Sequence, residues 1–382
     1  MATIESYATK AGRRYRVRYR TPDRRQTDRR GFTTKRDAER FARTVEVSKD
    51  RGEWIDPADA RATVGELAGP WLDGKRSLKP SSFRPLDAAW RVHVAPRWAA
   101  VPVGEVRPSD VQAWITALST GDEAADPPVK PKSATTVLRA YGVLAGILDA
   151  AVKDRRLLAN PARTVDTLPR KTRKQHVYLS HEQVHAVADA AKYPVLVLVL
   201  AYCGLRWGEA VALRVKDVDL QRRRLTVHEN AVEVGGRIHV GTPKGHRART
   251  VPFPRFLGER LAGQLEGKAP ADLVFPGPEG GHLRTARVHA DNYSWFASAL
   301  DAAGAPRITP HDLRHTAASF AVSAGANVKA VQRMLGHSSA AMTLDVYADL
   351  FDRDLDAVAD ALDQAVSRSS VGRMWADDAA QA

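Results

Sequence analysis

One continuous apolar run, Tyr193 to Leu205, limits the folds open to this chain more than any other segment does. Its sequence is YPVLVLVLAYCGL. The run is too short to span a bilayer, because a membrane-crossing helix needs about 20 apolar residues. A helix over 193–203 would be apolar on all sides, so it has to be surrounded by other parts of the chain. The run therefore predicts a core helix that ends at Gly204 inside a globular domain.

The 382 residues are enough for two or three domains. Changes in pattern divide the chain into segments 1–57, 63–160, 161–177, 178–367 and 368–382. We expect a multidomain protein: a small α+β N-terminal domain with a three-stranded sheet and one helix, then an all-α domain. A basic linker, a mainly α domain with a small antiparallel β-sheet and a flexible tail follow. In that last domain we expect strands at 223–230, 236–241 and 248–253, and helices at 289–303, 311–324, 327–335, 339–348 and 351–367.

Arginine alternates with aromatic or apolar residues from position 14 to position 20. Because strand side chains alternate between faces, one face carries the arginines and the other carries the remaining three side chains. The arginines are Arg14, Arg16, Arg18 and Arg20. The formal net charge of +14 favours a polyanionic partner. The alternating run has no interleaved acids, so DNA contact is favoured over a merely solvated edge strand.

The linker 161–177 is also basic, with a cluster of Arg170, Lys171, Arg173 and Lys174. An extended basic linker can lie along a phosphate backbone, although many solvated linkers have the same composition. The N-terminus lacks the apolar core of a secretory signal, so no membrane partner is expected. Cys203 is the only cysteine, which excludes an intrachain disulfide and a cysteine-based zinc site and fits a reducing cytoplasm.

Five polar residues stand where a plain apolar core would not place them. Arg206 follows the apolar helix in GLRWGEA, and His311 and Arg314 lie one helical turn apart in HDLRHT. His337 follows a glycine in LGHSS, and Tyr347 lies in VYAD. Each signal alone is common, but their order and spacing resemble the tyrosine recombinase (phage integrase) family across about residues 175–365.

The resemblance implies an organisation and a function. Segment 63–160 resembles the core-binding domain, segment 178–367 the catalytic domain, and segment 1–57 the arm-site-binding domain of phage-type integrases. The family implies a site-specific recombinase that integrates or excises phage or mobile-element DNA without a metal or other cofactor. Its implied partners are double-stranded attachment sites of core and arm type, with a homotetramer and a Holliday junction formed on DNA. The resemblance also leaves room for a DNA-bending accessory protein and a directionality factor, and it places the protein in the bacterial cytoplasm, at the nucleoid.

The same resemblance implies roles for the residues. Tyr347 is the nucleophile that forms a 3′-phosphotyrosine bond, His311 accepts its proton, and His337 donates a hydrogen bond to the phosphate. Arg206 and Arg314 supply positive charge, which protein side chains have to provide where no metal does. A lysine on a β-hairpin turn protonates the leaving oxygen, and Lys244 in GTPKGH fits that position. Many relatives have threonine or serine next, whereas here Gly245, His246 and Arg247 follow, so His246 and Arg247 remain alternatives.

Two other functions fit parts of the pattern. A type IB topoisomerase shares the tyrosine, arginine and histidine chemistry, but the arginine-faced N-terminal segment and the spelling of the boxes disfavour it. A non-enzymatic DNA-binding regulator fits the net charge, but it does not need the five site residues. An apolar stripe of Phe351, Leu355, Val358 and Leu362 follows the tyrosine, and packing within the chain and docking on a neighbouring protomer are both open to it.

Overall fold

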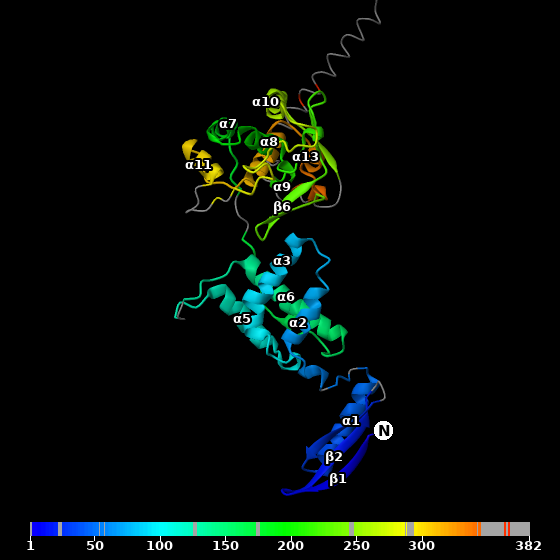
Figure 1. Ribbon diagram of the computed structural model, residues 1–382. Helices are drawn as coiled ribbons and strands as arrows, with labels where there is room; N and C mark the ends of the chain where they lie inside the picture. The colour runs from blue at the N-terminus through cyan, green and yellow to red at the C-terminus, as the bar shows by residue number, and fades with distance from the viewer. Residues whose placement is uncertain are drawn as a thin grey trace, which may run out of the picture. The chain divides into compact units, whose positions relative to one another are not determined.

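The computed structural model describes residues 2–21, 25–52, 54–56, 58–124, 128–172, 176–243, 248–286, 288, 294–341, 343–344, 363 and 366. The chain divides into two compact units, residues 1–173 and 174–382 (Figure 1). The first unit holds two groups of buried apolar side chains, one in its N-terminal α/β part and one in its helical part. The second unit is built around the large apolar core that contains the run 193–205.

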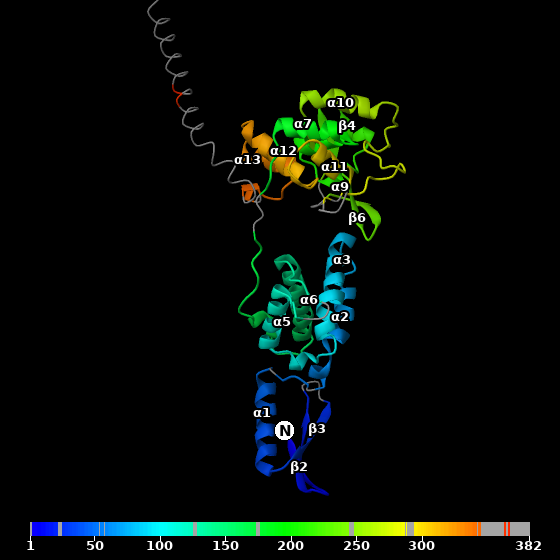
Figure 2. The ribbon, with the colours of Figure 1, turned by 90° about the vertical axis from the view of Figure 1, so that its left-hand side faces the viewer.

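The N-terminal part is an antiparallel sheet of β1 (Thr3–Thr9), β2 (Gly12–Arg20) and β3 (Gln26–Phe32) in the order β1-β2-β3. Helix α1 (Lys35–Asp50) lies along one face of this sheet (Figure 2). Val17 and Tyr19 are buried against the helix, as the alternation in β2 predicts. The Thr34 hydroxyl accepts a hydrogen bond from the Asp37 amide, which fixes where α1 begins.

The helical part packs around α6 (Ala134–Lys153). The Thr63 hydroxyl and the Glu66 carboxylate form a capping box that starts α2. By length and composition α6 is apolar enough to cross a membrane, and 50% of that apolar window is buried inside this core. A core helix passes the same test, so α6 gives only weak evidence for a span. The other helical elements of this part are η1 (Asp59–Arg61), α2 (Val64–Asp73), α3 (Pro80–Ala89), the π-helical turn η2 (Trp90–Val94), α4 (Ala95–Trp98), η3 (Val103–Glu105), α5 (Pro108–Thr120) and η4 (Pro161–Thr164).

In the second unit the apolar run forms α8 (Pro194–Cys203), which ends at Gly204 in the left-handed conformation with φ 64°. Helices α7 (His181–Ala190), α10 (Arg255–Leu265) and α12 (Asp312–Ser323) pack against α8. The core helix predicted over 193–203 is thus confirmed. The remaining helical elements are α9 (Trp207–Ala210), η5 (Val215–Asp217), α11 (Trp295–Ala302) and α13 (Val328–Leu335).

The expectation of one small sheet in this unit is wrong, because its strands form two. One sheet has the order β4-β5-β8, and the other pairs β6 with β7. The strand expected over 223–230 is divided between them at His228 and Glu229, whose side chains pair with Asp217 and Arg214. These contacts lie at the point where the chain leaves one sheet for the other. The strands are β4 (Val218–Asp219), β5 (Arg224–Val227), β6 (Asn230–Val234), β7 (Arg237–Gly241) and β8 (Arg249–Pro252).

The helices expected at 311–324 and 327–335 are confirmed as α12 and α13. Helix α11 begins at Trp295, later than the expected 289, in a region where residues 289–293 lie outside the described residues. Most of the helices expected at 339–348 and 351–367, and all of the tail 368–382, also lie outside them.

Candidate active site

Arg206 stands at the start of α9, directly after the turn that ends α8. Its backbone N–H donates to Glu209 Oε2 at 2.9 Å, and its Nη1 donates to Glu209 Oε1 at 2.9 Å. The Arg206 side chain is 25% exposed, whereas the Glu209 carboxylate is fully buried. The buried carboxylate of Glu209 therefore orients a guanidinium that still reaches solvent.

Arg314 lies in the first turn of α12 and is buried. Its Nη1 donates to the Gly204 carbonyl at 2.5 Å and its Nη2 to the Leu335 carbonyl at 2.6 Å. The guanidinium therefore joins the C-terminal end of α8 to the C-terminal end of α13. Arg206 also contacts the C-terminal end of α13, since its Nη2 lies 3.5 Å from the Gly336 carbonyl oxygen. Two arginines from distant parts of the sequence thus meet beside His337.

His337 follows Gly336, which ends α13 in the left-handed conformation with φ 65°. Its Nδ1 shares a hydrogen bond of 2.9 Å with the Thr343 hydroxyl. Burial, followed by the charges of Arg314 and Arg206, lowers the pKa of His337 to about 4. The imidazole is therefore neutral at pH 7 and can donate through one nitrogen only.

His311 precedes α12, one turn before Arg314. Loss of hydration and the nearby Arg314 charge lower the pKa of His311, while Asp312 opposes the shift. A neutral imidazole next to cationic groups is able to accept a proton, as a general base must. The site thus combines two permanent positive charges with two neutral imidazoles, a set suited to stabilising an anionic transition state and moving a proton.

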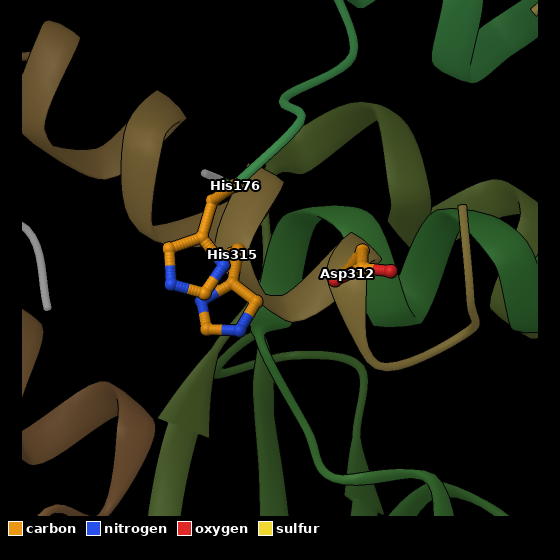
Figure 3. A group of neighbouring side chains, drawn as sticks. All are labelled: His176, Asp312 and His315. Atoms are coloured by element: carbon orange, nitrogen blue, oxygen red, sulfur yellow. The ribbon is translucent and has the colours of Figure 1, made fainter. Parts of the chain in front are cut away.

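A second group of histidines lies beside His311. The rings of His176 and His315 lie against each other with centroids 3.9 Å apart (Figure 3). The ring of His315 also meets that of His311 edge-on, with centroids 5.3 Å apart. Burial, then the neighbouring His176 and His311, lower the pKa of His315 to about 4. His315 is therefore a neutral side chain that lies between the linker residue His176 and His311.

His176, Asp312 and His315 each offer one ligand atom, and these atoms lie within 4.8 Å of one another. However, Asp312 Oδ2 already accepts hydrogen bonds from the Thr309 amide and hydroxyl, both at 2.7 Å. The rings of His176 and His315 also lie against each other, with centroids 3.9 Å apart and planes 32° apart. We therefore interpret the group as a histidine stack and not as a preorganised metal centre.

Several predicted site residues lie outside the described residues, namely Lys244, its alternatives His246 and Arg247, the nucleophile Tyr347, and Arg173 and Lys174 of the linker. Arg170 and Lys171 are described and exposed. The structure also adds a residue that the sequence motifs did not reveal, Arg249, which binds both oxygens of Glu209 at 2.9 and 2.6 Å. Its only signal in the sequence was an arginine at the start of an expected strand.

On the N-terminal sheet, an acid from a neighbouring strand lies among the arginines of the run 14–20. Glu5 of β1 lies directly opposite Arg16 of β2, and it pairs with Arg16 and, at 3.1 Å, with Arg18. Strand pairing brings this acid in from another part of the chain, so inspection of the run 14–20 could not find it. Arg14 and Arg20 lie on the same face, and Arg20 is exposed.

Comparisons with known proteins find one matching family and several relatives. Residues 177–353 match the phage integrase family. The integrase of Mycobacterium phage D29 is 28% identical over 332 residues, which cover 82% of this chain and 84% of that integrase. The tyrosine recombinase XerC of a Mycobacterium species (strain KMS) is 27% identical over 252 residues, covering 61% of this chain and 75% of XerC.

Two solved structures are similar in fold. One is the Tn1549 transposon integrase in complex with a circular intermediate DNA, with a TM-score of 0.64, 20% identity, and coverage of 78% of this chain and 99% of that chain. The other is a lambda integrase tetramer bound to a Holliday junction, with a TM-score of 0.55, 14% identity, and coverage of 87% and 95%.

Proposed function

Because the chain belongs, through residues 177–353, to the phage integrase family of tyrosine recombinases, we propose that this site-specific recombinase cuts DNA by forming a 3′-phosphotyrosine bond at Tyr347. The observation that carries the proposal is the meeting of Arg206 and Arg314 with two neutral imidazoles. Guanidiniums stay protonated at any working pH and match the geometry of phosphate oxygens.

The reaction balances without an external energy source. The Tyr347 oxygen attacks the scissile phosphorus while His311 accepts the phenolic proton, because a phenol with a pKa near 10 is mostly neutral at pH 7. The bond from phosphorus to the 5′-oxygen breaks, and Lys244 protonates that oxygen. A 5′-hydroxyl from the partner DNA then attacks the phosphotyrosine, which restores the phenol and joins new strands. His337 donates to a phosphate oxygen through both steps.

The three parts of the chain divide the DNA contacts. Segment 178–367 is the catalytic domain, segment 63–160 the core-binding domain and segment 1–57 the arm-binding domain, joined by linker 161–177. Arg14, Arg16, Arg18 and Arg20 face arm-type DNA, and Arg170, Lys171, Arg173 and Lys174 follow the backbone of core-type DNA. Supporting this, Arg14, Arg16, Arg18 and Arg20 alternate with other residues along β2 and so share one sheet face, and Arg170 and Lys171 are exposed.

The recombinase acts as a homotetramer through a Holliday junction in the bacterial cytoplasm, integrating or excising phage or mobile-element DNA. The lambda integrase tetramer on such a junction, which shares the fold, supports this assembly. A DNA-bending protein and a directionality factor are further partners. The apolar stripe after Tyr347 serves either packing within the chain or contact between protomers.

A suicide substrate tests the proposal directly. Candidate attachment DNA is nicked near the scissile phosphate, so that the released fragment diffuses away and a covalent adduct accumulates. Tyr347→Phe should abolish the adduct while binding survives. Tyr202→Phe is the matched control, because the Tyr202 hydroxyl contacts His181 and His185 instead of the site. An adduct formed by Tyr347→Phe would mean that the nucleophile is another residue. Plasmids with paired attachment sites then separate recombination from simple relaxation, the outcome expected of a topoisomerase.

A further inference from the structure

Arg249 holds a central position in the candidate site, although no motif pointed to it. It is the first residue of β8, and its side chain is only 13% exposed. Nη1 donates to Glu209 Oε1 at 2.9 Å, Nη2 donates to Oε2 at 2.6 Å, and Nε donates to the Met334 carbonyl at 3.3 Å. A single guanidinium thus binds the buried carboxylate in a bidentate fork and also binds the last turn of α13.

Glu209 is shared between two arginines. Burial raises the pKa of the Glu209 carboxyl, but the hydrogen bonds and charge of Arg249, and then those of Arg206, outweigh burial and hold the pKa at about 2. A fully buried carboxylate with this pKa is charged at every working pH. The Glu209 carboxylate therefore attracts any guanidinium that can reach it. The orientation of Arg206 then depends on how many of its hydrogen bonds Glu209 makes with each arginine.

Among the side-chain hydrogen bonds to Glu209, Arg249 donates two and Arg206 donates one. Because the Arg249 fork occupies both carboxylate oxygens, Arg206 makes only one side-chain bond to Glu209. A guanidinium carries five N–H donors. Among the described residues, Arg206 uses one on Glu209 and one, at 3.5 Å, on the Gly336 carbonyl. Without Arg249, Glu209 would be free to take Arg206 into a bidentate pair of its own, which would turn the fork of Arg206 away from the phosphate.

Arg249 also lies against the turn that presents His337. A Cβ added to Gly336 would lie 2.8 Å from Arg249 Nε and 3.0 Å from Cζ. The Arg249 charge is among the causes that lower the pKa of His337. The same side chain thus contacts the carboxylate partner of Arg206 and the backbone just before His337.

We infer that Arg249 is a positioning residue for phosphoryl transfer: it occupies Glu209 so that Arg206 presents its remaining donors to the scissile phosphate. The inference rests on the proposed function. It assigns Arg249 no contact with substrate, and it explains why a recombinase site keeps a second arginine on a carboxylate that one arginine would neutralise.

The test uses the full chain and the nicked duplex that the wild-type chain cleaves. Arg249→Met removes all donors and keeps an apolar stem. We expect the single-turnover rate constant of adduct formation to fall by about 10- to 100-fold. This loss is smaller than the largest losses seen when a direct transition-state donor is removed. Affinity, measured in the Tyr347→Phe background, should change by less than about threefold. Arg214→Met is the matched control, since Arg214 pairs with Glu229 and the Ala271 carbonyl elsewhere in the unit.

A second substrate separates positioning from loosened packing. A methylphosphonate at the scissile position removes the negative charge that Arg206 has to meet, so the difference between wild type and Arg249→Met should shrink. The double variant Arg249→Met with Glu209→Gln removes the buried charge, so it remains usable if the single variant fails to fold. The double variant should form adduct faster than Arg249→Met does. If Arg249→Met does not fold, the rate of the double variant should lie less than 100-fold below that of the wild type.

Three results would overturn the inference. They are a rate for Arg249→Met within about threefold of wild type, an equal loss on phosphate and methylphosphonate, and an equal loss in Arg214→Met. An absence of adduct with the wild-type chain itself, on DNA that it binds, would instead count against the proposed function.

Discussion

Replacement of Gly336 by alanine tests the packing of the site without removing a charged group. Gly336 has a φ of 65°, and an added Cβ would lie 2.8 to 3.0 Å from three atoms of Arg249. The end of a free arginine could move aside easily, but this one is held by Glu209 and the Met334 carbonyl. Alanine therefore has to strain the backbone and also displace a fixed guanidinium.

Gly325 provides the matched control. It also follows a helix with a positive φ, 78°, but an added Cβ would meet nothing within 4 Å. Gly325→Ala should cost only the left-handed strain, about 1–2 kcal/mol. Gly336→Ala should cost the same strain plus one hydrogen bond to a charged group, about 1.5–3 kcal/mol. At about 2–4 °C per kcal/mol for a unit of this size, Tm should fall by about 2–8 °C and about 5–20 °C respectively.

Calorimetry or urea unfolding of the two full-length variants measures the difference, and adduct formation on the suicide substrate gives the functional readout. Gly325→Ala should cleave at the wild-type rate, whereas Gly336→Ala should cleave more slowly. If the two free energies of unfolding agree within about 0.5 kcal/mol, the contact between Arg249 and Gly336 has no energetic weight and this reasoning fails.

Further predictions concern the proton donor, pH and the N-terminal sheet. Lys244→Ala should slow cleavage by about 10²–10⁴, and a substrate with sulfur as the 5′-leaving atom should restore it, since a thiolate needs no acid; absence of rescue would favour one of the alternative donors. The pKa of His337 is about 4 in the folded chain against an ordinary 6.5, so the unfolded chain binds the proton first and stability falls from pH 6.5 towards 4. His337→Gln should lower that slope by up to about 1.4 kcal/mol per pH unit, measured by urea unfolding, and an unchanged slope would contradict the assignment. Glu5→Gln should release the two arginines it pairs with, tighten DNA binding and steepen its salt dependence; binding that is unchanged across a salt series would exclude this face as a DNA contact.

The sequence by itself determined the features that depend on near neighbours in the chain. The end of α8 at Gly204 and the alternating faces of β2 arise within a turn and along a strand. A glycine that ends a helix or a period of two can be identified from a few residues because the interactions involved are equally short in range. The order of the chemistry-bearing boxes was also visible, since it is a property of the chain and not of its folding.

Only the tertiary structure decided which charged residues that are distant in sequence pair with one another. Arg249 meets Glu209 across 40 positions, Arg314 meets Gly204 across 110, and Glu5 reaches Arg16 through strand pairing. Where 223–230 divides between two sheets, His228 and Glu229 likewise contact residues of other segments. Residue type predicts that a buried carboxylate needs a cation, but packing alone selects which cation reaches it and which guanidinium keeps donors for the phosphate.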